Sequence, residues 1–425
     1  MVKALITLAL KNRLVVLMLA AGLFAWGIYA IKQNPIDAIP DLSENQVIVF
    51  TEWMGRSPQL MEDQITYPLV SNLQGIPKIK NVRGTSMFGM SFVYVIFEDD
   101  VDIYWARTRV LERLNYAQRL LPEGVTPSLG PDGTGVGHIF WYHLEAPKMD
   151  LGEQRALQDW YIKFGLQTVP GVAEVASFGG FEKQYQILLD PVKLQFYNVS
   201  LMDVMSKVKS NNNDVGGRKF EMSDMAYIIR GLGYIKNKED IEEIALKQYN
   251  GIPVRVKDIG TVQLGGDLRL GIFDQNGEGE VVGGIVVMRY GENADKVITA
   301  VKAKIKDIEK GLPEGVKFKV SYDRSTLIKE AIESVKGTLI EELITVSIVI
   351  LIFLFNWRSA LVILIQLPIS VAIGFILLEA FGLSSNIMSL TGIALAIGVV
   401  VDDGIVMVEN SYRHICDEQI KRTSE

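Results

Sequence analysis

Apolar residues gather into four long runs, one near the start of the chain and three near its end. The runs cover residues 14–31, 338–355, 360–378 and 387–409. A helix needs about 20 predominantly apolar residues to cross a bilayer, so each run predicts a membrane-spanning helix. Residues 32–337 contain no comparable run. They predict a large folded domain in water.

This middle segment alternates between strand-like and helix-like patterns. Strands are expected at 46–53, 80–84, 91–97, 138–145, 172–178 and 184–189, and helices at 57–73, 103–120 and 151–169. The order repeats a unit of strand, helix and strand, which is typical of ferredoxin-like βαβ subdomains. The predicted fold class is an α-helical membrane protein with a large α+β periplasmic domain.

The patterns divide the chain into consecutive parts. The expected parts are a cytoplasmic lead-in (1–13), the first span (14–31), a first ferredoxin-like subdomain (32–135), a second subdomain in two pieces (136–210 and 267–336) around an inserted lobe (211–266), three further spans (338–355, 360–378 and 387–409) and a cytoplasmic tail (410–425). The second piece ends in an amphipathic helix that leads into the second span.

Flanking positive charges orient the spans. Lys and Arg precede the first span and follow the fourth, and Arg358 lies between the second and third. By the positive-inside rule these segments are cytoplasmic, so the large domain lies outside, in the periplasm of a cell with two membranes. A cleaved signal peptide is the alternative for the first run, although its apolar core is longer than the usual 7–15 residues.

Composition excludes several other classes. The net charge is −7 without a basic stripe, which gives no reason to expect a nucleic-acid partner. One cysteine and three histidines exclude a disulfide framework and make a zinc site improbable. The chain carries no nucleophile elbow and no phosphate-binding loop. It is therefore predicted to be neither an enzyme nor ATP-driven, and to have no bound cofactor.

Two adjacent carboxylates interrupt the fourth run. Asp402 and Asp403 lie within NIMSLTGIALAIGVVVDDGIVMVEN, where a charge costs roughly 2.5–3.5 kcal/mol or more. Such acids usually mark an ion or proton path, so Asp402 is the predicted proton carrier, coupled to Asp403. Ala394 and Gly398 share the helical stripe of Asp402 and would let a neighbouring helix approach. An interfacial acid that only forms hydrogen bonds is the alternative.

Other polar and sulfur-bearing residues near the spans are weaker candidates. Met388 and Met407 offer thioethers to a soft metal such as Cu⁺ or Ag⁺, although methionine also fills gaps in packed helices. Glu341 and Glu342 open the second span as a candidate polar entrance for protons, or else lie at the membrane interface. Glu409 is expected to be an interfacial anchor.

Three methionine pairs are spaced i, i+3, and two histidines flank one strand. The pairs are Met87 with Met90, Met202 with Met205, and Met222 with Met225. In helices each pair would share a face, and core packing is the simpler explanation. His138 and His143 are expected on opposite faces of their strand, where they do not chelate one ion together.

Several motifs resemble the heavy-metal efflux branch of the resistance–nodulation–division transporters, most closely its copper/silver exporters. They are PIDAIPDLSENQV (35–47), YVIFEDDVDIYWARTRVLERL (94–114), DGTGVG (132–137), LQDWYIKFGLQTVPGVAEVASFGG (157–180) and YDRSTLI (322–328). The resemblance covers nearly the whole chain in order.

The resemblance implies a proton antiporter of the bacterial inner membrane that exports Cu⁺ or Ag⁺. It implies a homotrimer that works with a periplasmic adaptor and an outer-membrane channel. Ala396 stands where divalent-metal exporters tend to carry Asp, which favours a monovalent ion. The family has twelve spans in two halves, so this chain is expected to be a truncated, split or fragmentary product, or one part of a two-chain pump. The partners of Asp402 and the main metal site are then expected in the other half.

Two alternatives remain open. The Asp402–Asp403 doublet is more like the multidrug branch of the same superfamily, which exports organic substrates. The absence of a second half also fits a membrane-tethered periplasmic module that does not transport.

Overall fold

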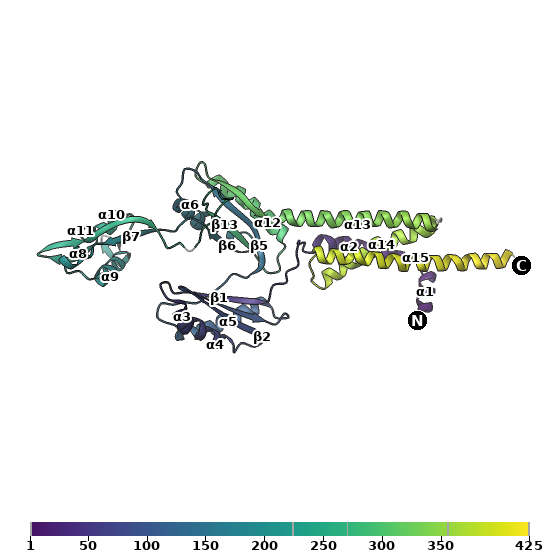
Figure 1. Ribbon diagram of the computed structural model, residues 1–425, viewed down its shortest axis with the longest axis horizontal. Coiled ribbons are helices and arrows are strands. Elements are labelled where there is room, and N and C mark those ends of the chain that lie inside the picture. Colours follow the sequence, from purple (N-terminus) through teal and green to yellow (C-terminus); the bar gives the residue numbers. More distant parts are fainter. Residues whose placement is uncertain (1, 223–224, 270, 355–356, 424–425) are drawn as a thin grey trace.

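The computed structural model describes residues 2–222, 225–269, 271–354 and 357–423. Figure 1 shows an elongated molecule in which a small lobe lies at one end, two sheet domains lie in the middle and a group of long helices lies at the other end.

The first domain is a four-stranded antiparallel sheet covered by helices on one face. Its strands are β1 (Gln46–Glu52), β2 (Ile79–Met87), β3 (Met90–Phe97) and β4 (Ser128–Leu129), in the order β2-β3-β1-β4. Its helices are α3 (Pro58–Met61), α4 (Tyr67–Leu73) and α5 (Ile103–Ala117), with a 3₁₀ turn at Gln118–Leu120. Alternate residues such as Val47 and Val49 are buried against Leu69 and Val110. This is the period of two that a half-covered strand requires.

The second domain repeats the same topology. Its strands are β5 (Gly133–Glu145), β6 (Val172–Phe178), β13 (Gly283–Arg289) and β14 (Lys317–Asp323), in the order β14-β5-β13-β6. Its helices are α6 (Leu151–Leu157), α7 (Lys163–Gln167) and α12 (Ala294–Ile308), with a 3₁₀ turn at Glu309–Gly311. In both sheets the first and third strands lie at the centre, as in ferredoxin-like folds. The strand–helix–strand units predicted from the sequence are confirmed.

A π-helical turn interrupts the first helix of each domain, which the sequence pattern did not predict. The turns cover Glu62–Thr66 and Gln158–Ile162. Each brings a polar side chain onto the sheet. The Thr66 hydroxyl lies 2.7 Å from that of Ser91, and Gln158 accepts a hydrogen bond from the Tyr142 hydroxyl.

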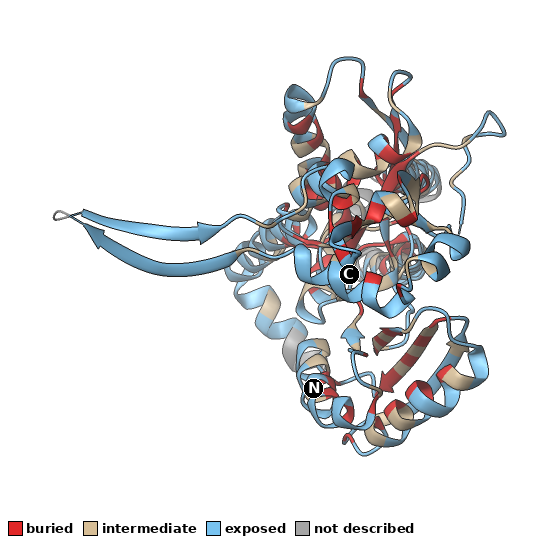
Figure 2. Ribbon diagram, turned by 90° about the vertical axis from the view of Figure 1, so that its left-hand side faces the viewer, coloured by how far each residue is buried: buried red, intermediate tan, exposed pale blue. Residues whose placement is uncertain are grey.

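The lobe lies between β6 and β13 in the chain and has its own core. Its strands are β7 (Lys183–Leu189), β8 (Val215–Met222), β9 (Met225–Gly231), β10 (Ala245–Tyr249), β11 (Ile252–Arg255) and β12 (Gly260–Gly266), and its helices are α8 (Pro191–Phe196), α9 (Leu201–Asn211), α10 (Lys238–Glu242) and α11 (Val256–Ile259). Because β7 pairs with β12 and Ile187 packs into the lobe core, the lobe extends from β7 rather than from residue 211. The β8–β9 hairpin is exposed along its described length and projects from the lobe (Figure 2).

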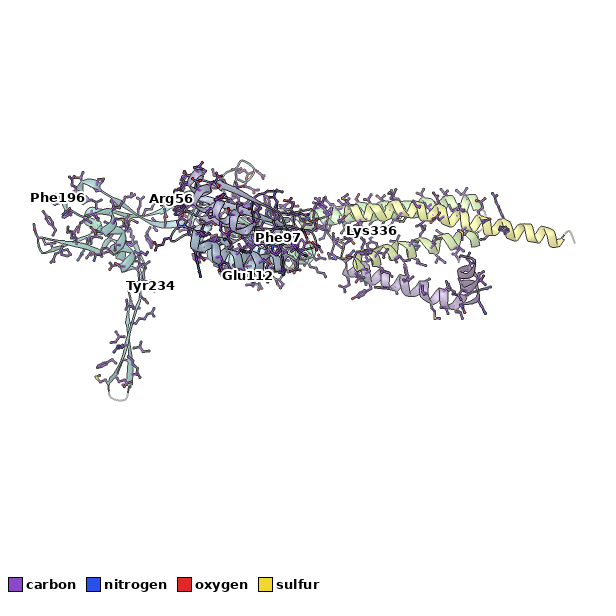
Figure 3. All side chains as sticks on the ribbon, turned by 90° about the horizontal axis from the view of Figure 1, so that it is seen from below. Arg56, Phe97, Glu112, Phe196, Tyr234 and Lys336 are labelled. Atoms are coloured by element: carbon purple, nitrogen blue, oxygen red, sulfur yellow. The ribbon has the colours of Figure 1, made fainter. Side chains whose placement is uncertain are left out.

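Long helices occupy all four positions where spans are predicted. They are α2 (Arg13–Gln33), α13 (Arg324–Leu354), α14 (Trp357–Ala380) and α15 (Ile387–Thr423), preceded by α1 (Val2–Lys11). Among the described residues, Arg13–Gln33 and Ile387–Ser411 are long and apolar enough to cross a membrane. Helix α13 continues without a break from the second domain, and Figure 3 places Lys336 where it leaves that domain.

Candidate functional site

Helix α15 carries the predicted proton carrier, and local hydrogen bonds fix its beginning. The Asn386 side chain accepts a hydrogen bond from the Ser389 backbone N–H at 3.0 Å, and the Ser389 hydroxyl accepts one from the Asn386 N–H at 2.9 Å. Reciprocal bonds of this kind satisfy N–H groups that have no partner inside the helix. The helix therefore starts at a defined residue, which sets the position of every side chain after it.

The acidic pair lies away from the seam on which α15 packs. Ile397 and Val401 are buried against Leu367 of α14 and form the centre of that seam. At 100° per residue, Asp402 lies about 100° and Asp403 about 200° around the helix from Val401. Both side chains are exposed in this chain. Among the described residues, neither carboxylate has a hydrogen-bond or ion-pair partner.

The close approach of α14 to α15 lies on a different face from Asp402, at Gly404, about 200° around the helix. Among the described residues, a Cβ built on Gly398 would meet nothing within 4 Å, so no helix of this chain covers that position and the predicted approach stays a prediction. A Cβ on Gly404 would instead lie 2.8 Å from the Gln366 Oε1 of α14. Gln366 is an amide in a mostly apolar stretch of α14, and it lies against the residue that follows the acidic pair in the chain. The occurrence of one amide in such an apolar stretch was the sequence signal that could have drawn attention to Gln366.

The remaining candidates of the membrane region lie apart from one another. Met388 and Met407 are both exposed, and their separation along α15 is about 28 Å at 1.5 Å per residue. Glu341 is exposed on α13, and the side chain of Glu342 lies outside the described residues. Glu409 accepts a hydrogen bond from Arg413 at 2.6 Å. Of these candidates, Met407 and Glu409 share a short stretch of α15 with Asp402 and Asp403.

A junction of backbone pairs joins the end of α2 to the turn between α14 and α15. The Asp37 N–H donates to the Ser385 carbonyl at 3.0 Å, and the Ser385 N–H donates to the Pro35 carbonyl at 2.8 Å. The buried Asn34 amide donates to the Ser385 hydroxyl at 2.9 Å. The segment after α2 and the turn before α15, about 350 residues apart in the chain, thus form a short parallel β-bridge in which Ile36 pairs with Ser385.

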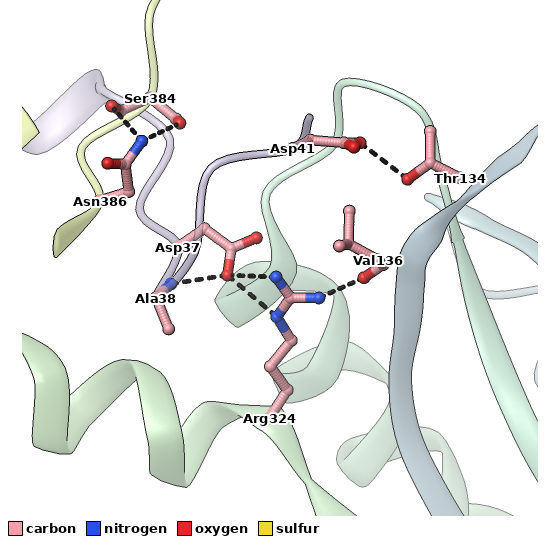
Figure 4. A network of polar contacts seen from close by, with 8 residues as sticks. All are labelled: Asp37, Ala38, Asp41, Thr134, Val136, Arg324, Ser384 and Asn386. Carbon is pink, nitrogen blue, oxygen red and sulfur yellow. Dashed lines mark hydrogen bonds and ion pairs between the residues drawn. The ribbon is translucent and has the colours of Figure 1, made fainter. Parts of the chain in front are cut away.

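An ion pair ties this junction to the second sheet domain (Figure 4). Arg324, the first residue of α13, places Nε 3.0 Å and Nη2 2.9 Å from Asp37 Oδ1. Its Nη1 donates to the Val136 carbonyl of β5. The Arg324 side chain is 6% exposed and that of Asp37 is 19% exposed, so little water screens the pair. Asp37 lies in the motif 35–47 and Arg324 in the motif 322–328, but no local pattern predicts that their side chains meet.

Asp323 fixes the start of α13 next to this ion pair. Its carboxylate accepts hydrogen bonds from the Ser325 N–H at 2.9 Å and from the Ser325 hydroxyl at 2.7 Å, and pairs with Lys302 of α12. Burial alone would raise the pKa of Asp323, but Lys302 and Ser325 hold it below its usual range. The helix that leaves the domain is thus anchored to α12 and to β5.

The two histidines do not gather into a metal site. His143 is buried and lies 2.9 Å from the Ser321 hydroxyl through Nδ1, whereas His138 is exposed. Among the described residues, no group of three or more His, Cys, Asp or Glu side chains is arranged to hold a metal ion. Methionine thioethers are not among these four ligand types.

Comparisons with known proteins agree with this architecture. The sequence profile of the AcrB/AcrD/AcrF family matches residues 5–425. The cation efflux system protein CusA of Escherichia coli K12 is 48% identical over 98% of this chain and 40% of its own length. The cobalt-zinc-cadmium resistance protein CzcA of Cupriavidus metallidurans is 37% identical over 99% of this chain and 40% of its own length.

A solved structure extends the likeness to three dimensions. The crystal structure of a heavy metal efflux pump superposes with a TM-score of 0.87 at 35% identity, covering 96% of this chain and 41% of that one. The chain spans about 40% of the length of the relatives it matches. The resemblance drawn from motifs is confirmed. The chain has the porter fold of these pumps and belongs to the AcrB/AcrD/AcrF family of resistance–nodulation–division proteins.

Proposed function

We propose that this chain is the N-terminal half of a proton-driven exporter of heavy-metal cations in the bacterial inner membrane. In this proposal it is a secondary active transporter with four spans, a cytoplasmic N-terminus and a large periplasmic domain. The observation that carries the proposal is the pair Asp402–Asp403 on an apolar helix whose outer face is uncovered. An acid in such a helix is costly unless it serves an ion or proton path.

The position of the acids supports the relay role. The exposed neighbours Leu395, Val399 and Val406 surround them with apolar surface that needs lipid or another helix as a partner. Once covered, a carboxyl in this environment favours its neutral form, because burial raises the free energy of the charged form. Such an acid takes up a proton on the acidic side and releases it when water returns.

The junction supplies a route by which a change at α15 reaches the periplasmic domain. The turn before α15 is bonded to residues 34–38, and Asp37 is paired with Arg324 of the second domain. A shift of α15 on protonation therefore pulls on a connected set of polar contacts rather than on a flexible loop. Two packed arrangements of these elements would give the alternating states that transport requires.

The cargo proposed is Cu⁺ or Ag⁺. Identity to CusA (48%) exceeds identity to CzcA (37%), and thioethers such as Met388 and Met407 suit monovalent soft ions. Assembly is proposed as a homotrimer with a periplasmic adaptor, an outer-membrane channel and the remaining half of the transporter. The partners of Asp402 would lie in that half.

The test is Asp402→Asn in a complete pump that contains this chain. Silver and copper resistance should be abolished while the amount of protein in the membrane stays unchanged, because the amide cannot carry a proton. Glu409→Gln is the matched control and should retain resistance, since Glu409 is paired with Arg413 near the end of the apolar stretch. Normal resistance in the Asp402→Asn pump would refute the relay role.

An organic-substrate exporter of the same superfamily is the second candidate. The Asp402–Asp403 doublet favours it, whereas the identities to cation efflux proteins oppose it. Resistance profiles against copper, silver, zinc and organic drugs separate the two.

A further inference from the structure

Three methionines gather at one end of the first sheet domain. Met87 ends β2 and Met90 begins β3, and the two are direct cross-strand partners on either side of the turn Phe88–Gly89. Met54 follows β1, and its sulfur lies 3.0 Å from the point where a Cβ on Gly89 would sit. The three residues therefore lie around a single turn.

The strand pattern places Met87 and Met90 on the same face. Ser86 and Ser91 both bond to Thr66 of the covering helix, so the residues next to them point to the opposite, open face of the sheet. Side chains of direct cross-strand partners start about 4.5–5.5 Å apart at their Cβ atoms. Each methionine has three rotatable side-chain bonds, so rotation about them is able to bring the two sulfurs to one point.

Backbone hydrogen bonds hold Met54 against this pair. The Trp53 N–H donates to the Gly89 carbonyl at 2.8 Å, and the Gly89 N–H donates to the Arg56 carbonyl at 2.9 Å. The loop 53–56 is therefore clamped to the turn from both sides. Gly89 adopts a φ of 68°, which a larger residue rarely tolerates, and a side chain there would also collide with Met54.

The charges near the three sulfurs are compatible with a cation. Glu52 is the cross-strand partner of Met90 and points to the same open face, where its carboxylate adds negative charge. Arg56, a cationic residue of the loop 53–56, lies over the Trp53 ring at 4.6 Å from its centroid. Its guanidinium is thus held on an aromatic face by a cation–π interaction.

The cluster is open to solvent and distant from the membrane helices. Met54 is 47% and Met87 is 52% exposed. Figure 3 shows Arg56 at the end of the first domain that faces the lobe, while Phe97 lies nearer the long helices. A metal ion in water outside the membrane has direct access to this end of the domain.

We propose that Met54, Met87 and Met90 form a binding site for a monovalent soft cation, Cu⁺ or Ag⁺, on the first sheet domain. Thioether sulfur selects such ions over zinc, cobalt or cadmium, which prefer nitrogen, oxygen and thiolate ligands. Thioethers carry no proton, so binding here releases none. The site goes beyond the proposed proton relay, and only its contribution to export rests on the proposed function.

The test uses the full chain in detergent with [¹³C-methyl]methionine labels and Ag⁺ alone in chloride-free buffer. The methyl signals of the three residues should shift together and saturate with the first equivalent of Ag⁺, while Zn²⁺ leaves them in place. The variant Met54→Leu/Met87→Leu/Met90→Leu should weaken the tightest Ag⁺ binding by at least about tenfold. Leucine keeps the volume and apolar character of each side chain.

The matched control is Met202→Leu/Met205→Leu on α9, an exposed pair of the same spacing without a third methionine. It should bind the first Ag⁺ as the unmodified chain does. The proposal is overturned if the triple variant retains full affinity, or if the signals of Met202 and Met205 shift as early as those of the cluster. Should the triple variant fail to fold, Met54→Leu alone leaves both strands intact and should still weaken binding.

These outcomes are separate from those of the transport test. Loss of resistance in the Asp402→Asn pump leaves Ag⁺ binding at the cluster unchanged, because the two sites lie in different parts of the molecule. Conversely, a chain without Ag⁺ binding at the cluster says nothing against the proton relay.

Discussion

Helices α5 and α15 are both rich in apolar residues, but α5 buries its apolar stripe within this chain, whereas α15 leaves most of its apolar side chains unburied. In α5 one stripe that includes Ala106, Val110 and Leu114 is buried against the sheet, and the outer face is charged. In α15 only 17% of the apolar stretch is buried, and residues such as Leu395 are 76% exposed. A helix that is apolar all round needs an apolar environment on every side.

The difference shows where each helix obtains its stabilisation. The chain itself supplies the partner of α5, so that helix is complete within its domain. The partner of α15 must come from outside the described residues, as lipid or as another protein segment. The same contrast separates the sheet domains from α2, of which 11% is buried.

The sharpest test of this comparison substitutes the same residue type in both regions. Leu166→Ala removes a fully buried side chain of the second domain and should lower the free energy of unfolding by about 3–5 kcal/mol through lost burial and a cavity. Leu395→Ala should change it by less than about 0.5 kcal/mol, because this chain leaves Leu395 exposed. Urea unfolding in detergent measures both. Equal losses of unfolding free energy in the two variants would contradict the claim that the sheet domain buries its apolar residues and α15 leaves most of its own unburied.

The junction between the two regions should respond nearly as strongly. Arg324→Ala leaves Asp37 and the Val136 carbonyl without their partner and should cost about 3 kcal/mol, as removal of one member of a buried ion pair does. Hydrogen exchange should quicken in residues 34–38 and 384–387 together. Arg324→Lys, which keeps the charge but loses the fork of donors, should give a smaller change. Unaltered exchange in 384–387 would show that the junction does not connect the regions.

A single methyl group tests the packing of the long helices. A Cβ on Gly27 of α2 would lie 2.3 Å from the Cβ of Ala372 on α14, so Gly27→Ala should separate the pair at a cost of about 1–3 kcal/mol. Gly22 lies in the same helix and has nothing within 4 Å. Gly22→Ala should therefore be neutral or slightly stabilising, since alanine favours helix. Thermal unfolding in detergent, followed by the loss of helical signal, compares the two variants. Equal unfolding midpoints would contradict the close packing of α2 on α14.

The smallest expected effect is a pH dependence within the second domain. Burial and the nearby positive charge of Lys319 lower the pKa of His143 below 6.5, whereas the negative charge of Glu145 opposes this shift. The unfolded chain then binds more protons than the folded chain as the pH falls through about 6.5, so stability declines until the pH reaches the lowered pKa. His143→Gln should flatten this part of the profile. Urea midpoints between pH 7.5 and 5 provide the measurement, with His138→Gln as the exposed control.

Periodicity predicted much of the fold, but the spacing of the three methionine pairs did not decide how their members meet. The spacing i, i+3 suits a helix, and Met202 with Met205 does lie on α9. Met87 with Met90 and Met222 with Met225 are instead direct cross-strand partners of paired strands. Three residues along a chain bring side chains together in a helix and also across a two-residue turn. The spacing alone does not distinguish the two.

The sequence by itself determined the elements: the apolar helices, the buried stripe of α5, the repeated strand–helix–strand units and the placement of Asp402 and Asp403 on an apolar helix. Each of these is a property of consecutive residues, because helix and strand periods depend only on local geometry. The tertiary structure alone decided that Arg324 meets Asp37 across 287 positions, that Met54 joins Met87 and Met90, and that the lobe begins at β7. Such meetings depend on how distant segments cross in space, which no local pattern encodes.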